Sequence, residues 1–380
     1  MTIPFIDLKA QQARIRSDLD ARMAKVLDHG GYIMGPEVGE LETALSDHSG
    51  AQHVVSCSSG TDALLLALMA LGVKPGDGVI VPSFTFTASA EVMPMLGAVP
   101  VFAEIDEDSF NLDPHGLEAA MKSAQDAGVN MVGIIAVGLF GQPANMPALS
   151  AFAKTHNLWL VDDAAQSYGT SFDGARTGTM ADISCTSFFP AKPLGCYGDG
   201  GAVFTDNAEY ADLMRSCRVH GQGLDKYHND RIGMTARLDT LQAAILLSKL
   251  AIFDEELSLR QQVADRYEEQ LSDIVKTPKL APEATSSWAQ YTICLPEGCL
   301  KNGTDRAGLQ KQLMADGVPT AIYYPLPMHR QKPYARFPVA GGALPVTDRL
   351  SEIVLALPMH PYLSAQDQDH ICAALKAALR

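Results

Sequence analysis

Short apolar, β-prone runs alternate with helix-compatible segments between about residues 53 and 218, and this alternation restricts the possible folds more than any other feature of the sequence. The expected strands are His53–Cys57, Val79–Val81, Val99–Ile105, Val132–Val137, Leu158–Val161, Ile183–Phe189 and Ala202–Thr205. Helical patterns between and after them include 114–125, 147–156 and 207–218. Repeated β-α units of this length predict an α/β fold, with a mostly parallel sheet covered by helices on both faces.

The segments on either side of this region extend the prediction to the whole chain. Before it, we expect helices at 10–29 and 37–48. After it, we expect a long helix from Leu238 to about 274, strands at 291–295 and 320–324, and helices at 305–316, 345–355 and 365–379. A chain of 380 residues exceeds the usual size of a single core. The proline-rich stretch near Lys276 therefore indicates a crossing between a large domain (1–250) and a smaller α+β domain (251–380).

Composition excludes several classes of function. Acidic residues outnumber basic ones 44 to 29, for a net charge of −15, so nucleic acid and anionic membranes would be repelled. The seven cysteines include no C-x-x-C pair, which predicts reduced thiols in a cytoplasmic protein with no disulfide framework and no zinc or other metal site. No apolar run is long enough to span a membrane.

Three polar segments follow predicted strands, at the edge of the sheet where such folds bind ligands. In Ser59–Asp62, a Ser-Gly-Thr-Asp sequence opens an apolar helix, which suits a phosphate seat but also an ordinary helix cap by Ser59 or Thr61. Pro82-Ser-Phe-Thr-Phe86 follows the second strand. Asp162-Asp163 directs its two carboxylates to opposite faces. Either could act as a cap, whereas an inward carboxylate would need a cation such as a protonated ring nitrogen.

The segment around Lys192 carries the strongest candidate for chemistry. Pro190 and Pro193 restrict the backbone on either side of the lysine, and four glycines follow at 195, 198, 200 and 201. A turn of this kind can direct the amine into a pocket between two strands. There the amine would lose hydration and could attack a carbonyl as the neutral base. The alternative is a loop lysine that points into solvent.

Taken together, these segments resemble the DegT/DnrJ/EryC1/StrS family, the pyridoxal-phosphate-dependent nucleotide-sugar aminotransferases of fold type I. The matching stretches are Gly31–Pro36, Ser59–Leu64, Pro82–Phe86, Asp162–Gln166, Ser187–Lys192, Arg237–Ile245, Tyr323–His329 and Leu357–His360. They span nearly the whole chain in family order. The resemblance implies a seven-stranded, mostly parallel sheet in the large domain and a smaller C-terminal domain.

The resemblance also implies a role for each matching residue in binding pyridoxal 5′-phosphate. Lys192 holds the cofactor covalently and moves the reacting proton, and Asp163 pairs with the pyridine nitrogen. Gln166 lies beside the phenolic oxygen, and Phe86 stacks on the ring. The phosphate contacts are Gly60, Thr61 and Ser187.

Residues 221–237 imply a homodimer with shared active sites. The family places an asparagine there that reaches the phosphate in the neighbouring subunit, but this chain has Thr235, whose hydroxyl has a shorter reach. Pocket residues for the sugar nucleotide are expected at Tyr32, Tyr323, His329 and Arg237.

The implied reaction is a ping-pong transamination from an amino donor, glutamate by resemblance, to a keto group on a nucleotide-activated sugar. The sequence around Lys192 and Arg237 most resembles that of the branch that aminates C3 of UDP-2-acetamido-2-deoxy-3-keto-glucuronate for surface polysaccharide or glycoconjugate synthesis. A dTDP-linked 3-keto- or 4-keto-6-deoxyhexose is the alternative substrate.

Three other functions were weighed against this one. Family members that dehydrate sugars carry histidine at the lysine position, whereas this chain has Lys192. A nicotinamide oxidoreductase needs G-x-G-x-x-G after the first strand, where this chain reads Ser-Cys-Ser-Ser-Gly-Thr. A ligand sensor that kept the fold would often lose the lysine or the carboxylate and add a DNA-binding segment, which this acidic chain lacks.

Overall fold

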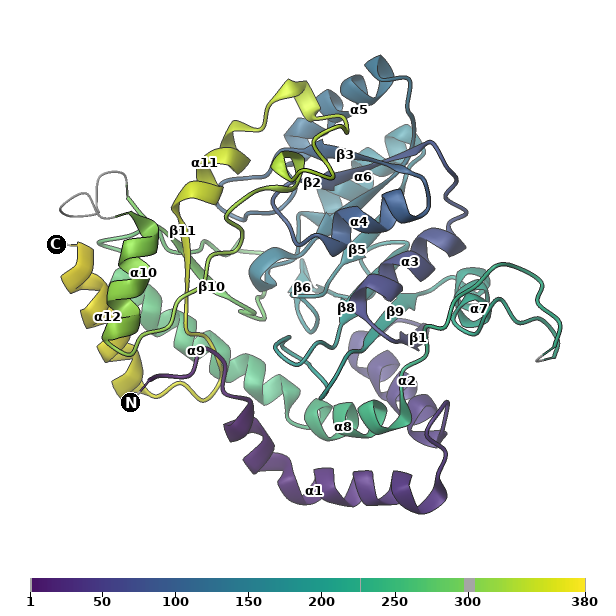
Figure 1. Ribbon diagram of the computed structural model, residues 1–380, viewed down its shortest axis with the longest axis horizontal. Helices are drawn as coiled ribbons and strands as arrows, with labels where there is room; N and C mark the ends of the chain where they lie inside the picture. The colour runs from purple at the N-terminus through teal and green to yellow at the C-terminus, as the bar shows by residue number, and fades with distance from the viewer. Residues whose placement is uncertain (1, 226, 297–304, 380) are drawn as a thin grey trace.

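The computed structural model describes residues 2–225, 227–296 and 305–379, and its centre is a seven-stranded sheet in the order β1-β9-β8-β5-β4-β2-β3 (Figure 1). The strands are β1 His53–Cys57, β2 Asp77–Pro82, β3 Val99–Ala103, β4 Asn130–Val137, β5 Trp159–Asp163, β8 Ile183–Ser187 and β9 Gly201–Thr205. Strand β9 is antiparallel to both of its neighbours, and the remaining pairs are parallel. The prediction of a mostly parallel α/β sheet is therefore confirmed.

Helices cover both faces of this sheet because neighbouring strand residues point to opposite sides. On β9, Val203 joins the core formed with α3, α5, α6 and α7, whereas Ala202 and Phe204 join the core formed with α2 and α8. The helices of the sheet region are α1 Leu8–His29, α2 Pro36–Ser49, α3 Gly60–Ala70, α4 Ala88–Met95, α5 Leu117–Asp126, α6 Met146–His156, α7 Ala208–Cys217 and α8 Thr240–Leu250. Short 3-10 turns occupy Pro114–Gly116 and Leu139–Gly141.

A second core lies around an antiparallel pair of strands near the C-terminus. Its elements are α9 Phe253–Leu271, β10 Tyr291–Cys294, α10 Arg306–Ala315, β11 Val354–Leu357 and α12 Ala365–Leu379. Between β10 and β11 the chain also forms α11 Pro345–Ile353 and 3-10 turns at Met328–Arg330 and Ala340–Gly342. A small hairpin, β6 Ser171–Phe172 and β7 Ala175–Arg176, stands apart from both.

Two segments pack against the core of the other part of the chain. Ile3, at the N-terminus, lies in the second core, and Ile3 N–H donates a hydrogen bond to Gly317 O at 3.0 Å. Conversely, Met328, Tyr334 and Leu344 pack into the core of the large sheet. The division into 1–250 and 251–380 stays a prediction, and these two segments cross it.

The expected long helix from Leu238 to 274 is wrong, because the chain forms two helices that end and begin around Ala251–Ile252. Leu246 and Leu247 at the end of α8 pack on the sheet core, whereas Val263 and Tyr267 of α9 pack in the second core. A single straight helix could not bury both sets, so the chain bends between them.

The expected strand at Thr320–Tyr324 is also wrong. In this segment Ala321 makes a single bridge to Ala356, and the strand that pairs with β10 is β11. The sequence pattern predicts a helix that extends to 355 and includes the start of β11, but α11 ends at Ile353. A short apolar run such as Val354-Leu-Ala-Leu fits a buried helix end as well as a buried strand, so periodicity could not separate the two.

In the described residues, no helix is both long and apolar enough to cross a bilayer. The six cysteines in this part of the chain are free and buried, and the seventh, Cys299, lies outside it.

Candidate active site

The carboxyl ends of six strands lie along one edge of the large sheet. Only β9 runs against the others among the seven strands of this sheet, so β1, β2, β3, β4, β5 and β8 end at the edge where β9 begins. At this edge Gly201 is paired with Cys57 on one side and Ser187 on the other. The predicted segments at Ser59, Asp163 and Ser187 are therefore neighbours.

An anion seat forms where the N-terminus of α3 meets the end of β8. Ser59 caps the helix by accepting a hydrogen bond from Asp62 N–H at 3.0 Å. A Cβ on Gly60 would lie 2.7 Å from the Cβ of Ser187, so only glycine permits this approach. Ser187 Oγ accepts a hydrogen bond from Phe189 N–H at 3.2 Å, which leaves its own proton to donate. The first N–H groups of α3, Gly60 and Thr61 among them, lack partners within the helix and favour an anion.

Asp163 ends β5 as a buried carboxylate held by two donors. Ser89 Oγ donates to Oδ2 at 2.7 Å, and Ala165 N–H donates to Oδ1 at 3.2 Å. Burial raises the pKa of Asp163, and these hydrogen bonds and the charge of Lys192 oppose the shift. The sequence analysis missed Ser89, because one hydroxyl among several in a polar turn carries no signal of its own.

Asp162 faces the other side of the sheet. It is fully buried, and Ser184 Oγ donates to its Oδ2 at 3.3 Å. Its Oδ1 has no hydrogen-bond partner among the described residues. Burial, followed by the charge of Asp163, raises the pKa of Asp162 to about 7. Of the two adjacent carboxylates, Asp163 alone receives donors from the helix that borders the site.

Lys192 lies in a compact turn between β8 and β9. Its N–H donates to Phe189 O at 2.8 Å, and Cys196 N–H closes the turn by donating to Phe188 O at 2.8 Å. Loss of hydration lowers the pKa of the Lys192 amine, and the charge of Asp163 opposes this shift. Lys192 is half-buried, which favours an amine directed into a pocket over a fully hydrated loop lysine.

Gln166 and three aromatic residues border this pair of charges. Gln166 Oε1 accepts from Phe140 N–H at 2.7 Å, and its Nε2 lies 3.5 Å from Tyr324 OH. The ring of Phe86 is half exposed, with its centroid 6.3 Å from that of Tyr324. The sequence analysis does not single out Tyr324, because adjacent tyrosines cannot be ranked from sequence, and contact of Tyr323 with the sugar nucleotide stays a prediction.

The residues expected around the substrate occupy several elements. Tyr32 is exposed, and its carbonyl accepts from Thr240 N–H at 3.0 Å. Thr235 is exposed as well, and its hydroxyl lies 2.8 Å from His220 Nε2. The Nε of Arg237 is buried and has no hydrogen-bond partner among the described residues.

His329 differs from the other expected substrate residues because its ring is buried in a polar cluster. Nδ1 lies 2.7 Å from Ser83 Oγ, and Nε2 lies 3.3 Å from Asp348 Oδ1. Burial lowers the pKa of His329. Both ring nitrogens thus have partners within the chain, and contact of His329 with substrate stays a prediction.

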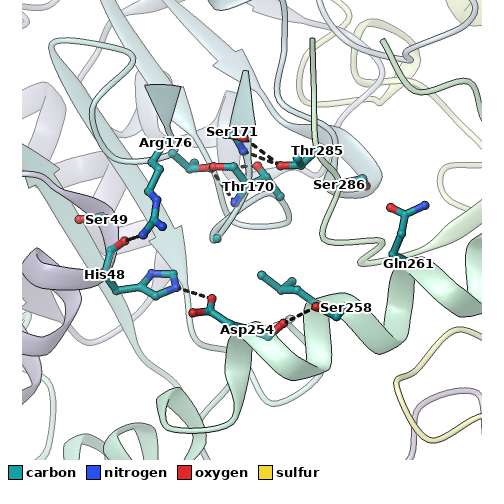
Figure 2. Close-up of a pocket in the computed structure, with 13 residues that line it drawn as sticks. His48, Ser49, Thr170, Ser171, Arg176, Asp254, Ser258, Gln261, Thr285 and Ser286 are labelled. Atoms are coloured by element: carbon teal, nitrogen blue, oxygen red, sulfur yellow. Dashed lines mark hydrogen bonds and ion pairs between the residues drawn. The ribbon is translucent and has the colours of Figure 1, made fainter. Parts of the chain in front are cut away.

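A separate cavity of about 340 Å³ lies between the end of α2, the β6–β7 hairpin and α9, and shares no lining residue with this site (Figure 2). His48 bridges its wall, with Nδ1 3.0 Å from Tyr168 OH and Nε2 3.0 Å from Asp254 Oδ1. The buried hydroxyls of Thr170 and Thr177 on this wall already donate to backbone carbonyls. The candidate active site is therefore the edge that carries Lys192 and Asp163.

Comparison with known proteins identifies the family. The profile of the DegT/DnrJ/EryC1/StrS aminotransferase family matches residues 13–376. The chain belongs to this family. It is 48% identical, over 98% of its length and 99% of the relative's, to UDP-2-acetamido-2-deoxy-3-oxo-D-glucuronate aminotransferase from Pseudomonas aeruginosa.

Two solved structures show the same fold. A DegT DnrJ EryC1 StrS aminotransferase from Brucella abortus superposes with a TM-score of 0.95 at 47% identity, over 99% of both chains. S. venezuelae DesV, solved in complex with a ketimine intermediate, superposes with a TM-score of 0.92 at 36% identity, over 100% of this chain and 99% of that one.

The protein is thus an aminotransferase that depends on pyridoxal 5′-phosphate. The residues at the sheet edge fit this cofactor: the Gly60–Ser187 approach leaves room for an anion at a helix N-terminus. Asp163 is a buried acceptor for a protonated ring nitrogen, and Lys192 supplies a dehydrated amine.

Gly60→Ala tests the anion seat. The added Cβ would meet the Cβ of Ser187 at 2.7 Å and displace the end of β8. Overpacking of this kind costs about 1–3 kcal/mol, so we expect cofactor affinity to fall about 10- to 100-fold, measured by fluorescence titration of cofactor-free protein. Gly39→Ala is the matched control, because an added Cβ there meets nothing within 4 Å. Equal affinity in both variants would rule out this seat.

Asp162→Asn tests the buried neutral acid. The pKa of Asp162 is about 7 when folded and about 3.9 when unfolded. Its contribution to stability is therefore present below pH 4 and is lost as the pH rises to 7. Between those values the free energy of unfolding should fall a few kcal/mol more in wild type than in the variant, measured by urea unfolding of cofactor-free protein. Asp47→Asn, at an exposed position of α2, should keep the wild-type profile. Parallel profiles for wild type and Asp162→Asn would contradict this assignment.

Proposed function

We propose that this protein transfers an amino group from glutamate to C3 of UDP-2-acetamido-2-deoxy-3-keto-glucuronate. The sugar nucleotide is the one named for its Pseudomonas aeruginosa relative, UDP-2-acetamido-2-deoxy-3-oxo-D-glucuronate aminotransferase. The observation that carries the proposal is the placement of the Lys192 amine and the Asp163 carboxylate close enough for their charges to interact, beside an anion seat. Similarity at 48% identity over nearly the full length of both chains supports this branch of the family over the dTDP-hexose branches.

When bound, pyridoxal phosphate acts as the electron sink of the reaction. Asp163 holds the charge that keeps the ring nitrogen protonated, and Ser89 fixes the orientation of that carboxylate. Burial lowers the pKa of Lys192 and so favours the neutral amine, the form that can accept a proton from the substrate. Gly60, Thr61 and Ser187 would hold the phosphate, and Phe86 and Gln166 would hold the ring.

Arg237 suits a reaction in which both substrates carry a carboxylate. Its Nε is buried without a partner in the described part of the chain, so the guanidinium retains donor capacity. Glutamate and the uronate sugar occupy a transaminase in turn, and one guanidinium can serve the carboxylate of each. Tyr32 and Tyr323 would then contact the rest of the sugar nucleotide, together with His329.

The substrate test uses purified protein converted to the pyridoxamine form by glutamate. Addition of UDP-2-acetamido-2-deoxy-3-keto-glucuronate should restore the visible absorbance of the lysine-bound cofactor. UDP-3-keto-N-acetylglucosamine, which lacks the C6 carboxylate, should do so at least about tenfold more slowly, since a lost charged hydrogen bond is worth about 1.5–3 kcal/mol. Arg237→Met should remove this discrimination, and Lys192→Ala should give no lysine-bound cofactor at all. Equal rates with both sugars would contradict the uronate assignment.

We further propose a homodimer in which residues that follow α7 in one subunit reach the active site of the other. The described residues 220–225 and 227–235 extend away from the body of the subunit (Figure 1). Their apolar side chains face solvent in the single chain, with Leu224 fully exposed and Ile232 87% exposed. A second copy of the chain would cover these side chains and place Thr235 near the phosphate.

Mixed dimers test the shared site. Thr235→Asp puts a negative charge beside the phosphate, and Lys192→Ala removes the amine, so each variant alone should be inactive. Chains of the two variants that are unfolded together and refolded would form hybrids with one intact site, and up to about a quarter of wild-type activity should return, as expected for random pairing of two chains. If the refolded mixture sediments as dimers but is as inactive as either variant alone, the active site is not shared between subunits.

We also propose a cytoplasmic location and a role in supplying a precursor of surface polysaccharide or glycoconjugate. The six described cysteines are free thiols, which suits the reducing cytoplasm.

A further inference from the structure

The turn that carries Lys192 packs Phe188, Leu194 and Cys196 into the core formed with α2 and α8, and within the described chain its hydrogen bonds to another helix are made at Tyr197. Phe188 N–H donates to Gly200 O at 2.7 Å and Cys196 N–H donates to Phe188 O at 2.8 Å, so the turn closes on itself. Gly195 lies so close to Phe189 O that an added Cβ would approach it to 2.6 Å. Residues 188–198 also make hydrogen bonds to the adjoining ends of β8 and β9. Within the described chain, their hydrogen bonds to any other helix or strand join Tyr197 to α8.

Helix α8 reaches Tyr197 with two side chains that lie two turns apart on one face. Gln242 Oε1 accepts from Tyr197 N–H at 2.9 Å, and Gln242 Nε2 lies 3.5 Å from Tyr197 O. Seven residues later, Lys249 Nζ lies 4.3 Å from the centroid of the Tyr197 ring. One side chain thus fixes the backbone of Tyr197, and the other packs its charge against the ring face.

Lys249 is an unusual residue for this position. It is only 1% exposed, and its Nζ has no hydrogen-bond partner among the described residues. Burial lowers the pKa of Lys249 to about 8, with the charge of Glu256 opposing the shift. A buried amine without an acceptor destabilises a fold, whereas a methionine of similar length would fill the same space without that cost. Stability therefore does not explain a lysine here.

We propose that Lys249 and Gln242 are positioning residues that hold Tyr197 and thereby fix the position of the Lys192 amine relative to Asp163. Lys249 acts through the aromatic ring, and Gln242 acts through the backbone. Because Tyr197 directly follows Cys196, whose N–H closes the turn on Phe188 O, a shift of Tyr197 would disturb this closure and with it the position of Lys192. This inference rests on the proposed role of Lys192 but not on the identity of the sugar.

Lys249→Met separates positioning from structural support. The variant should unfold at the same temperature as wild type or higher, because it removes a buried unpaired amine. Its kcat should nevertheless fall at least about tenfold with KM within about twofold, since a displacement near 1 Å of a reacting group can cost about a hundredfold in rate. Lys154→Met, an exposed lysine of α6, is the matched control and should match wild type in all these measurements.

A second measurement needs neither substrate nor cofactor. In cofactor-free protein, the pH dependence of reductive methylation of Lys192, followed by peptide mass spectrometry, reports the pKa of its amine. Loosening the turn should hydrate the amine and move the midpoint upward by about half a unit or more in Lys249→Met. This readout stays valid if the proposed sugar is wrong, so the two failures can be told apart.

Each outcome decides for or against the proposal. Wild-type kcat together with a wild-type methylation midpoint in Lys249→Met would overturn it. A variant that loses activity in proportion to a lower unfolding temperature, with an unchanged midpoint, would show a merely structural role and would also overturn it. If Lys249→Met does not fold, Gln242→Leu decides by the same two measurements, because it removes both hydrogen bonds to Tyr197.

Discussion

The electrostatic interaction between the buried Asp163 carboxylate and the dehydrated Lys192 amine is the constraint on which the rest of the structure depends. Burial raises the pKa of Asp163 and lowers that of Lys192, and the opposite charge of each offsets part of the other's shift. Each charge therefore favours the ionised form of the other. The fold must therefore hold the end of β5, which carries Asp163, at a fixed distance from the turn after β8, which carries Lys192. The parallel pairing of β5 with β8 does so.

The reversed strand β9 gives this arrangement its shape. Because β9 runs antiparallel to β8 and β1, the chain must turn back immediately after β8, and Lys192 lies in that turn. The same reversal places Gly201 between Ser187 and Cys57, so that the N-terminus of α3 meets the end of β8. One change of strand direction thus brings the amine and the anion seat to the same edge.

The sequence alone predicted the features that repeat along the chain and the polar residues that follow its strands. Alternating apolar runs predicted the sheet, and Lys192 and Asp163 were found because each follows a β-prone run. Partners that depend on how helices pack could not be found: Ser89 reaches Asp163 only because α4 lies over the end of β5. The break between α8 and α9 arises because the apolar residues of the two helices pack in different cores. Local periodicity cannot show that a second core exists.

Buried polar atoms without partners in the described chain recur near this site, among them Asp162 Oδ1, Arg237 Nε and Lys249 Nζ. Each such group lowers the stability of the fold by an amount that a matched apolar or amide side chain would restore. In the proposed function Arg237 would gain a partner from a carboxylate substrate, whereas Asp162 and Lys249 are almost fully buried. These groups lower the free energy of unfolding, but they fix the charge and the position of the side chains around the reacting amine. Substitutions that stabilise this region by removing these groups should therefore slow the reaction, as expected for Lys249→Met.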